Sequence, residues 1–313
     1  MYQSYFPVCY YPTRIIFIDD QENFIDSTSL LLKSYMLKTF TNPVDALEFI
    51  NREVKKQFSI ARMYEEINVQ SKYDLYTWQE FQANLLAALA KPHNEEYSVV
   101  ICDYQMPLLD GFELFENIHS HYLERILLTG EADFAKAVGA FNKGLINFYI
   151  RKDNSEIATE LMQLLETATW QYFNKFNAID AQPEDSFSFL YDPVLAQYFK
   201  TLMKEKRIME MYLWHYHGDL LVINARGEKS IISIRNQQAL DESVELVYQD
   251  YLEEPSEALD ELLKALKAGE KIISFIDETD EDATPQVFPV FKTLNTDQQT
   301  YYFFEQPFYQ IGK

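Results

Sequence analysis

Two short apolar segments that end in aspartate constrain the fold more than any other feature of the sequence. Residues 14–20 read Arg-Ile-Ile-Phe-Ile-Asp-Asp, and residues 97–103 read Tyr-Ser-Val-Val-Ile-Cys-Asp. Continuous apolar runs of this length are typical of parallel strands that are covered by helices on both faces. The aspartates would then lie at the carboxyl ends of two strands, where parallel α/β sheets place their functional groups.

The sequence alternates between predicted strands and helices up to about residue 175. Further strands are predicted at 36–41, 125–129 and 147–152. Helices are predicted at about 24–35, 44–50, 112–122, 131–143 and 155–173. This alternation predicts an α/β fold, a doubly wound five-stranded parallel sheet, over residues 14–175.

The rest of the chain predicts a second domain, since 313 residues suffice for two. Residues 1–13 are expected to form a tail, and the polar, proline-containing segment 176–190 a linker. Residues 191–313 predict an α+β domain with a mainly antiparallel sheet. Its helices are expected at 194–206, 236–251 and 256–268, and its strands at 209–217, 220–224, 230–235, 271–276, 287–293 and 300–306.

Polar side chains follow the predicted parallel strands at the edge where these strands end. Asp19 and Asp20 follow the first strand, Asp103 the third, Thr129 the fourth and Lys152 the fifth. Three carboxylates at one edge repel one another unless a cation is present, and oxygen ligands in a partly hydrated site suit Mg²⁺. A hydroxyl and an ammonium beside them can bind the oxygens of a phosphoryl group.

The same residues carry a family resemblance. The segment Asp103-Tyr-Gln-Met-Pro-Leu-Leu-Asp-Gly111, together with Asp19-Asp20, Thr129 and Lys152, resembles the receiver domain of two-component response regulators in order and strand context. The resemblance covers about the first half of the chain. It implies a phosphorelay switch that accepts a phosphoryl group from a sensor histidine kinase or a phosphotransfer protein.

The resemblance also implies a role for each acidic residue. Asp103 would be the phosphoacceptor and would form an acyl phosphate. Asp20 would bind Mg²⁺ directly, together with Asp103 and the backbone carbonyl of Gln105, whereas Asp19 would act mainly through water.

The remaining implied roles concern binding and switching. Thr129 and Lys152 would hold the phosphoryl oxygens, and Tyr149 would change rotamer together with Thr129. The face formed by residues 131–173 would mediate homodimerisation, as it commonly does in this family.

Two features depart from the family pattern. Asp153 follows Lys152, where the family usually has proline in a cis peptide bond. The chain between Asp20 and Asp103 is also about forty residues longer than usual, through a helix-prone insertion at about 53–93. We expect an extended second helix or an extra helical hairpin there, serving either as an interaction surface or as a packed decoration.

Composition restricts the partners and the compartment. The net charge is −22, which disfavours nucleic acid and anionic membranes. Cys9 and Cys102 are the two cysteines, and their surroundings make a disulfide improbable. The sequence shows no signal peptide and no membrane span, so a cytoplasmic location is expected.

The second domain carries no catalytic or DNA-binding motif that identifies its output. His215 and His217 share a strand face near Asp219, so a metal site is conceivable there, although strand histidines are more often surface residues. The acidic run 277–282 is expected to be a solvated loop rather than a Ca²⁺ site, because it lacks the usual glycine and terminal glutamate. Two hypotheses stay open: an output by protein interaction, or an enzyme or PAS-like small-molecule sensor gated by the receiver.

Overall fold

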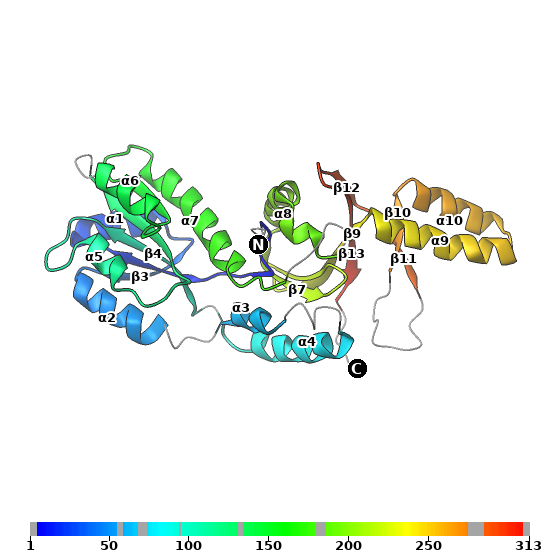
Figure 1. Cartoon of the computed structure of the whole chain (residues 1–313), viewed down its shortest axis with the longest axis horizontal. Coiled ribbons are helices and arrows are strands. Elements are labelled where there is room, and N and C mark those ends of the chain that lie inside the picture. The colour runs from blue at the N-terminus through cyan, green and yellow to red at the C-terminus, as the bar shows by residue number, and fades with distance from the viewer. Residues whose placement is uncertain are drawn as a thin grey trace. The chain divides into compact units, whose positions relative to one another are not determined.

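The computed structural model describes residues 5–54, 59–67, 74–93, 95–130, 134–179, 186–274 and 285–308. The chain forms two compact units, each assembled from separate parts of the sequence (Figure 1). The first, here named the parallel-sheet unit, consists of Pro12–Ile60 and Lys91–Phe176. The second, the antiparallel-sheet unit, consists of Met1–Tyr11, Ala61–Ala90 and Asn177–Lys313.

The parallel-sheet unit contains the predicted five-stranded sheet, with strand order β3-β2-β4-β5-β6. Every neighbouring pair is parallel. The strands are β2 (Arg14–Ile18), β3 (Met36–Phe40), β4 (Tyr97–Asp103), β5 (Glu124–Thr129) and β6 (Phe148–Arg151). The helices are α1 (Glu22–Leu31), α2 (Pro43–Glu53), α5 (Gly111–Glu116), α6 (Phe134–Asn142) and α7 (Ile157–Asn174). The doubly wound fold is therefore confirmed.

Alternating side chains of β4 explain why this sheet is covered on both faces. Val99 and Ile101 point into a core shared with α1 and α7. Val100 and Cys102 point into a core shared with α2, α5 and α6. Because successive residues of a strand face opposite sides, a continuous apolar run is stable only between two helical layers.

Helix α5 is shorter than the 112–122 expected from sequence. Asp110 caps its start, and its side chain and that of Glu113 form a reciprocal capping box. At the other end, the amide of Asn117 donates to the carbonyl of Glu113 at 2.7 Å. This side-chain bond satisfies a terminal carbonyl and closes the helix early. For α6, residues 131–133 of the predicted range lie outside the described residues.

The antiparallel-sheet unit has a six-stranded sheet of order β1-β7-β8-β9-β13-β12 and a separate pair, β10-β11. All of its pairings are antiparallel, as predicted for the second domain. The strands are β1 (Cys9–Tyr10), β7 (Ile208–His215), β8 (Asp219–Asn224), β9 (Lys229–Asn236), β10 (Lys271–Ser274), β11 (Gln286–Pro289), β12 (Lys292–Asn295) and β13 (Thr300–Pro307). The helices are α3 (Ile60–Met63), α4 (Leu75–Leu89), α8 (Pro193–Lys206), α9 (Gln237–Glu253) and α10 (Glu257–Lys267).

The single strand predicted at 287–293 is wrong, because the structure has two short strands there in different sheets. β11 pairs with β10, whereas β12 pairs with β13. Between them, the backbone N–H of Val290 donates to Glu270, and that of Phe291 donates to Phe303. The chain thus changes its hydrogen-bonding partner within two residues, which an apolar pattern alone does not reveal.

The N-terminal segment is not the free tail expected from sequence. Phe6, Val8, Cys9 and Tyr11 are fully buried, and β1 pairs with β7 at the edge of the large sheet. The aromatic and apolar side chains of this segment belong to the core of the antiparallel-sheet unit.

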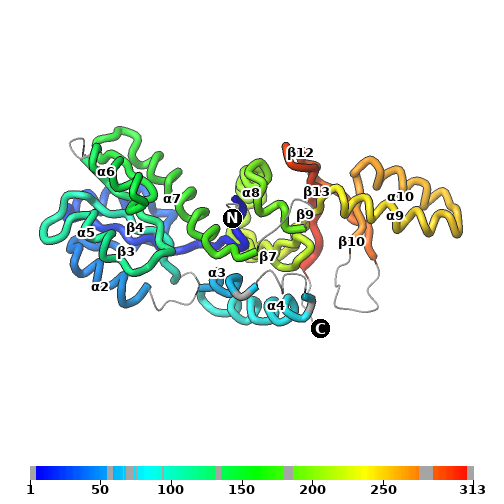
Figure 2. The backbone as a smooth tube through the Cα atoms, in the orientation of Figure 1, coloured from blue at the N-terminus to red at the C-terminus, as the bar shows by residue number. Residues whose placement is uncertain are grey.

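The insertion at 53–93 contains the extra helices α3 and α4 and does not extend α2, which ends at Glu53. Ala61–Ala90 belong to the antiparallel-sheet unit and not to the unit that holds the acidic cluster. Helix α4 lies against β7 (Figure 2). The hydroxyl of Tyr64 donates to the carbonyl of Leu213 at 2.9 Å, and the amide of Gln82 donates to the carbonyl of Trp214 at 2.8 Å. Because β1 is only two residues long, these side chains satisfy carbonyls of β7 that β1 does not reach.

The segment expected to be a linker is partly packed. Phe187, Phe189 and Leu190 are fully buried in the antiparallel-sheet unit, while residues 180–185 lie outside the described residues. The acidic run 277–282 also lies outside them. Across the described part of the chain, no helix combines the length and apolar character that a membrane span needs.

Candidate functional site

The structure brings together the three aspartates that the sequence places at the ends of β2 and β4. Carboxylate oxygens of Asp19, Asp20 and Asp103 lie within 4.8 Å of one another. Asp19 and Asp103 are buried, and Asp20 is partly exposed. Oδ1 of Asp20 is itself buried and has no hydrogen-bond partner. A buried oxygen without a partner, beside two other carboxylates, fits a site for a divalent cation.

The backbone after β2 fixes Asp19 in the cluster. The N–H of Gln21 donates to Oδ1 of Asp19 at 3.0 Å, and the N–H of Asp19 donates to the carbonyl of Phe40 on β3. The side chain therefore turns back over the strand end instead of extending into solvent. Its second oxygen faces the other charged groups of the cluster.

Lys152 provides the positive charge of the site. Its Nζ atom lies 2.7 Å from Oδ2 of Asp19 and 2.9 Å from Oδ2 of Asp103. The side chain is only 19% exposed. The backbone N–H of Lys152 donates to the carbonyl of Thr129, which attaches the end of β6 to the end of β5. The ammonium thus bridges two of the three aspartates.

The environment of Asp103 disfavours its charged form. Burial raises the pKa of this carboxyl above its ordinary value, and the negative charge of Asp19 adds to the effect. Lys152 and the backbone N–H of Gln105 act in the opposite direction, since both interact favourably with the carboxylate. A cation bound by the cluster would further favour the ionised form.

The loop that connects Asp103 to α5 passes close to the end of β4, and only glycine fits at position 111. A Cβ atom at position 111 would lie 2.6 Å from the carbonyl oxygen of Asp103 and 2.9 Å from Leu127. The N–H of Gly111 also donates to the carbonyl of Tyr104. The Asp-Gly pair of the motif therefore starts α5 and lets the backbone pass close to Asp103.

Thr129 and Tyr149 occupy the neighbouring strands. Thr129 is fully buried at the end of β5, and its hydroxyl donates to the carbonyl of Gly130 at 3.0 Å. Tyr149 on β6 is partly buried, and its ring meets that of Phe141 edge to face at 6.2 Å. The predicted pair of switch residues thus lies on adjacent strands of the sheet.

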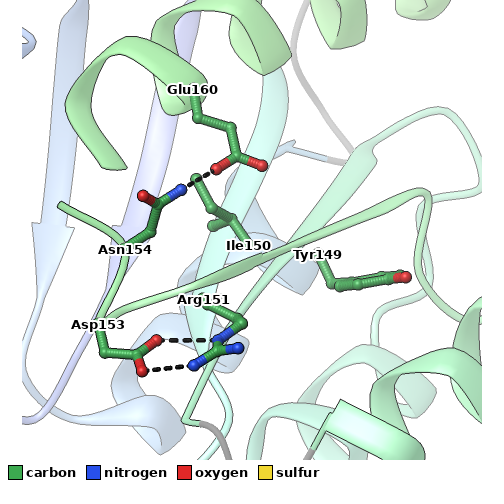
Figure 3. Close-up of a pocket in the computed structure, with 6 residues that line it drawn as sticks. All are labelled: Tyr149, Ile150, Arg151, Asp153, Asn154 and Glu160. Atoms are coloured by element: carbon green, nitrogen blue, oxygen red, sulfur yellow. Dashed lines mark hydrogen bonds and ion pairs between the residues drawn. The ribbon is translucent and has the colours of Figure 1, made fainter. Parts of the chain in front are cut away.

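Asp153 does not direct its carboxylate toward Lys152. Its two oxygens lie 3.0 and 2.6 Å from the guanidinium of Arg151 (Figure 3). This contact lowers the pKa of Asp153, which is half-exposed. The pair lines a surface pocket of about 350 Å³ together with Tyr149, Ile150, Asn154 and Glu160 (Figure 3). The carboxylate that replaces the usual proline is therefore neutralised by its neighbour on β6.

One contact near the site was not anticipated from sequence. Nζ of Lys136 on α6 lies 3.0 Å from the hydroxyl of Tyr104 and 5.2 Å from the centre of its ring. Tyr104 directly follows Asp103, so this bond ties α6 to the loop after β4. No local pattern links these two residues, because they lie on different elements.

The second unit does not assemble the conceivable metal site. Among the described residues, Asp19, Asp20 and Asp103 are the group of acidic, histidine or cysteine side chains that meets the distance for a shared ion, whereas His215, His217 and Asp219 do not. Asp219 is instead ion-paired with Arg235 at 2.9 Å. The guanidinium of Arg235 thus neutralises Asp219, as a bound metal ion would.

Comparison with known protein families finds a match to a stretch of the chain that includes part of this site. The sequence pattern of the response regulator receiver domain matches residues 57–166. That stretch contains Asp103, Thr129 and Lys152 but begins after Asp19 and Asp20. The structure adds these two acids, because β2 lies beside β4 in the sheet.

One solved structure is similar over the whole chain, and two others are similar over about half of it. The response regulator LqsR of Legionella pneumophila is similar over 100% of this chain and 92% of its own, with 25% identity and a TM-score of 0.72. A signal receiver domain from Pseudomonas fluorescens matches 51% of this chain and 97% of its own, with 23% identity and a TM-score of 0.34. A receiver domain from Methanospirillum hungatei matches 52% and 98%, with 18% identity and a TM-score of 0.35. No curated protein matches the sequence.

Proposed function

Because residues 57–166 match the response regulator receiver domain and the chain forms a second unit besides the parallel-sheet unit, we propose that it is a phosphorylation switch in two-component signalling. Asp103 is the phosphoacceptor, and a sensor histidine kinase or a phosphotransfer protein is the donor. The observation that carries the proposal is the convergence of Asp19, Asp20, Asp103 and Lys152 at the carboxyl edge of the parallel sheet.

The transfer needs a nucleophile and groups that hold the phosphoryl oxygens. A carboxylate oxygen of Asp103 forms the new P–O bond while the P–N bond of a phosphohistidine breaks, and the imidazole nitrogen takes that electron pair. Lys152 is already within 2.9 Å of Asp103, so its ammonium can donate to a phosphoryl oxygen after a small movement. Thr129, at the next strand end, supplies a hydroxyl for another oxygen.

Mg²⁺ is the cofactor that the acidic cluster fits. Asp20 and Asp103 would bind it directly with the carbonyl of Gln105, and Asp19 through water. When bound, the ion would offset the negative charge that the carboxylates and the phosphoryl group bring together. The unpartnered oxygen of Asp20 supports this assignment, because a buried carboxylate oxygen without any partner is costly.

The switch itself is proposed to use Thr129 and Tyr149. The hydroxyl of Thr129 now donates to Gly130 and would turn to the phosphoryl group, drawing the loop after β5 toward the site. Tyr149 would then turn inward and reshape the surface of α6, β6 and α7. We expect a shift in the monomer–dimer equilibrium through the 131–173 face, since allosteric coupling is commonly on the order of 1–3 kcal/mol.

The antiparallel-sheet unit is proposed to act by protein interaction. The absence of a recognised catalytic motif in the sequence of 191–313 favours that output over a gated enzyme or a PAS-like sensor. A changed pairing of the 131–173 face would reposition the units that follow α7. Such a route requires no catalytic residue in the second unit.

Labelling with acetyl phosphate tests the proposal. With Mg²⁺, the wild type should gain one phosphoryl group that hydroxylamine removes, as it does from acyl phosphates. Asp103→Asn should abolish the label, whereas the matched control Asp153→Asn should retain it, because its carboxylate pairs with Arg151. Persistent label in Asp103→Asn would reject Asp103 as phosphoacceptor. Analytical ultracentrifugation with and without beryllofluoride then tests the dimerisation step, which equal association constants would reject.

A further inference from the structure

Lys152 has a third partner besides the two aspartates. Its Nζ atom lies over the ring of Phe24, 4.7 Å from the ring centre. The ammonium is therefore enclosed by Asp19, Asp103 and an aromatic face. An ammonium within about 6 Å of an aromatic face is attracted to it by the ring quadrupole, and the attraction grows when the pair is shielded from water.

Local structure holds the Phe24 ring in this place. The residue lies in the first turn of α1, where its N–H donates to the carbonyl of Gln21 at 3.0 Å. Gln21 in turn donates to Asp19, so the helix start and the acidic cluster are connected. On its inner side, the ring packs against Phe17 of β2 at 6.2 Å. The Phe24 side chain is thus fixed between the core and the lysine.

Unlike the carboxylates of Asp19 and Asp103, the Phe24 ring has no other group to bind during the proposed reaction. Asp19 and Asp103 are the oxygens that a cation and the phosphoryl group would engage, so their attraction for Lys152 falls as the site fills. The face of Phe24 binds neither a cation-bound oxygen nor a phosphoryl group. Its contact with the ammonium therefore remains available throughout the transfer.

We propose that Phe24 is a positioning residue that holds the Lys152 ammonium at the phosphoryl site through a cation–π contact. This inference rests on the proposed phosphorylation of Asp103. In this role Phe24 does not bind the phosphoryl group and acts through Lys152. Replacing the ring by an aliphatic side chain would leave an apolar contact with Phe17 but remove the attraction for the ammonium.

The first test compares phosphorylation rates with acetyl phosphate in the full-length protein. Phe24→Leu should slow labelling about tenfold, the fold-change that corresponds to about 1.4 kcal/mol for a shielded pair. Phe24→Trp should restore most of the rate, since tryptophan gives the strongest cation–π contact. Phe148→Leu is the control, because Phe148 packs against the same core cluster from β6. It should not change the rate.

A double-mutant cycle separates positioning from packing. If Phe24 acts through Lys152, Phe24→Leu should have little effect on the residual rate of Lys152→Ala. Equal slowing in both backgrounds, or no slowing in either, would overturn the proposal.

A measurement of the contact between Lys152 and Phe24 in unphosphorylated protein tests the positioning role independently of the proposed phosphorylation. In metal-free wild type, the ring current of Phe24 should displace the NMR signals of the Lys152 methylene next to Nζ. Phe24→Leu should return them to ordinary values, and Phe148→Leu should not. If the displacement is missing in the wild type, the positioning role is wrong. If the displacement is present but neither the wild type nor Asp103→Asn is labelled, the ring contact stands and the phosphorylation proposal fails.

Discussion

Lys152 lies 2.9 Å from a carboxylate oxygen of Asp103, yet burial still raises the pKa of that carboxyl. Removal of the carboxylate from water destabilises its ionised form more than the attraction of the Lys152 ammonium stabilises it, and the negative charge of Asp19 destabilises it further. The parallel-sheet unit therefore carries a charged group that lowers its stability in the absence of a cation. Such a cost at a cluster of acids is typical of a site shaped for binding rather than for stability.

The first prediction is that Asp103→Asn stabilises the metal-free protein at neutral pH. Because the folded-state pKa of Asp103 is raised, its ionised form destabilises the fold above that pKa, and the penalty disappears as the pH falls below the ordinary value. The midpoint of thermal unfolding should be higher for the variant at pH 7, and the difference should shrink in acid. A variant less stable at pH 7 would contradict the burial argument.

The second prediction concerns Mg²⁺ and Asp20. Added Mg²⁺ should raise the unfolding temperature of the wild type, since a ligand that binds only the folded state stabilises it. Asp20→Asn should lose most of this increase, because it removes one negative charge from the cluster and leaves only a neutral amide oxygen as a possible ligand. Asp153→Asn is the control and should keep the increase. Equal Mg²⁺ stabilisation of Asp20→Asn and wild type would exclude Asp20 as a ligand.

The location of the candidate site was predictable because it depends on strand ends. Asp19, Asp103 and Lys152 each follow an apolar run, and parallel strands place their carboxyl ends at one edge. The contact of Lys152 with Phe24 was not predictable. It depends on the angle at which α1 leaves β2, which the apolar pattern does not contain.

The division of the chain could not be read from sequence either. Residues 61–90 have an ordinary amphipathic pattern, which does not say which core the apolar face joins. The buried side chains Tyr64 and Trp78 and the bond from Gln82 to Trp214 assign them to the antiparallel sheet. The register of β1 with β7 is similarly non-local, since it joins Cys9 to Tyr212.

The third prediction tests this assignment through Trp78. Its side chain is fully buried against Phe81 and Phe187, so Trp78→Ala should cost about 3–5 kcal/mol of unfolding free energy. Tyr76→Ala, on the same helix but 79% exposed, should change it by less than about 0.5 kcal/mol. Hydrogen exchange should locate the loss of protection in β7 rather than in β4. Loss of protection confined to β4 would mean that the insertion packs on the parallel-sheet unit, which would contradict the assignment.

The fourth prediction concerns a single hydrogen bond. Tyr64→Phe removes the hydroxyl that serves the buried carbonyl of Leu213, so about 1–3 kcal/mol should be lost from the antiparallel-sheet unit. Chemical denaturation followed by circular dichroism measures this loss. An unchanged free energy of unfolding would mean that another donor, or water, replaces the tyrosine.

The fifth prediction is that residues 177–313 do not fold alone. Without β1 and the helices α3 and α4, the edge of β7 is left with unsatisfied carbonyls and exposed apolar side chains. The isolated fragment should aggregate, and adding a peptide of residues 59–93 should improve its solubility. A soluble, cooperatively unfolding fragment would contradict the composite nature of this unit.

The most direct measurement of the central claim is to locate the phosphoryl group on the chain. Borohydride reduces an aspartyl phosphate to homoserine, so protein treated with acetyl phosphate and Mg²⁺ and then with borohydride can be digested and sequenced by mass spectrometry. We predict homoserine at position 103 and unmodified aspartate at positions 19, 20 and 153. Homoserine at another aspartate, or at none under conditions that label a known receiver domain, would contradict the account.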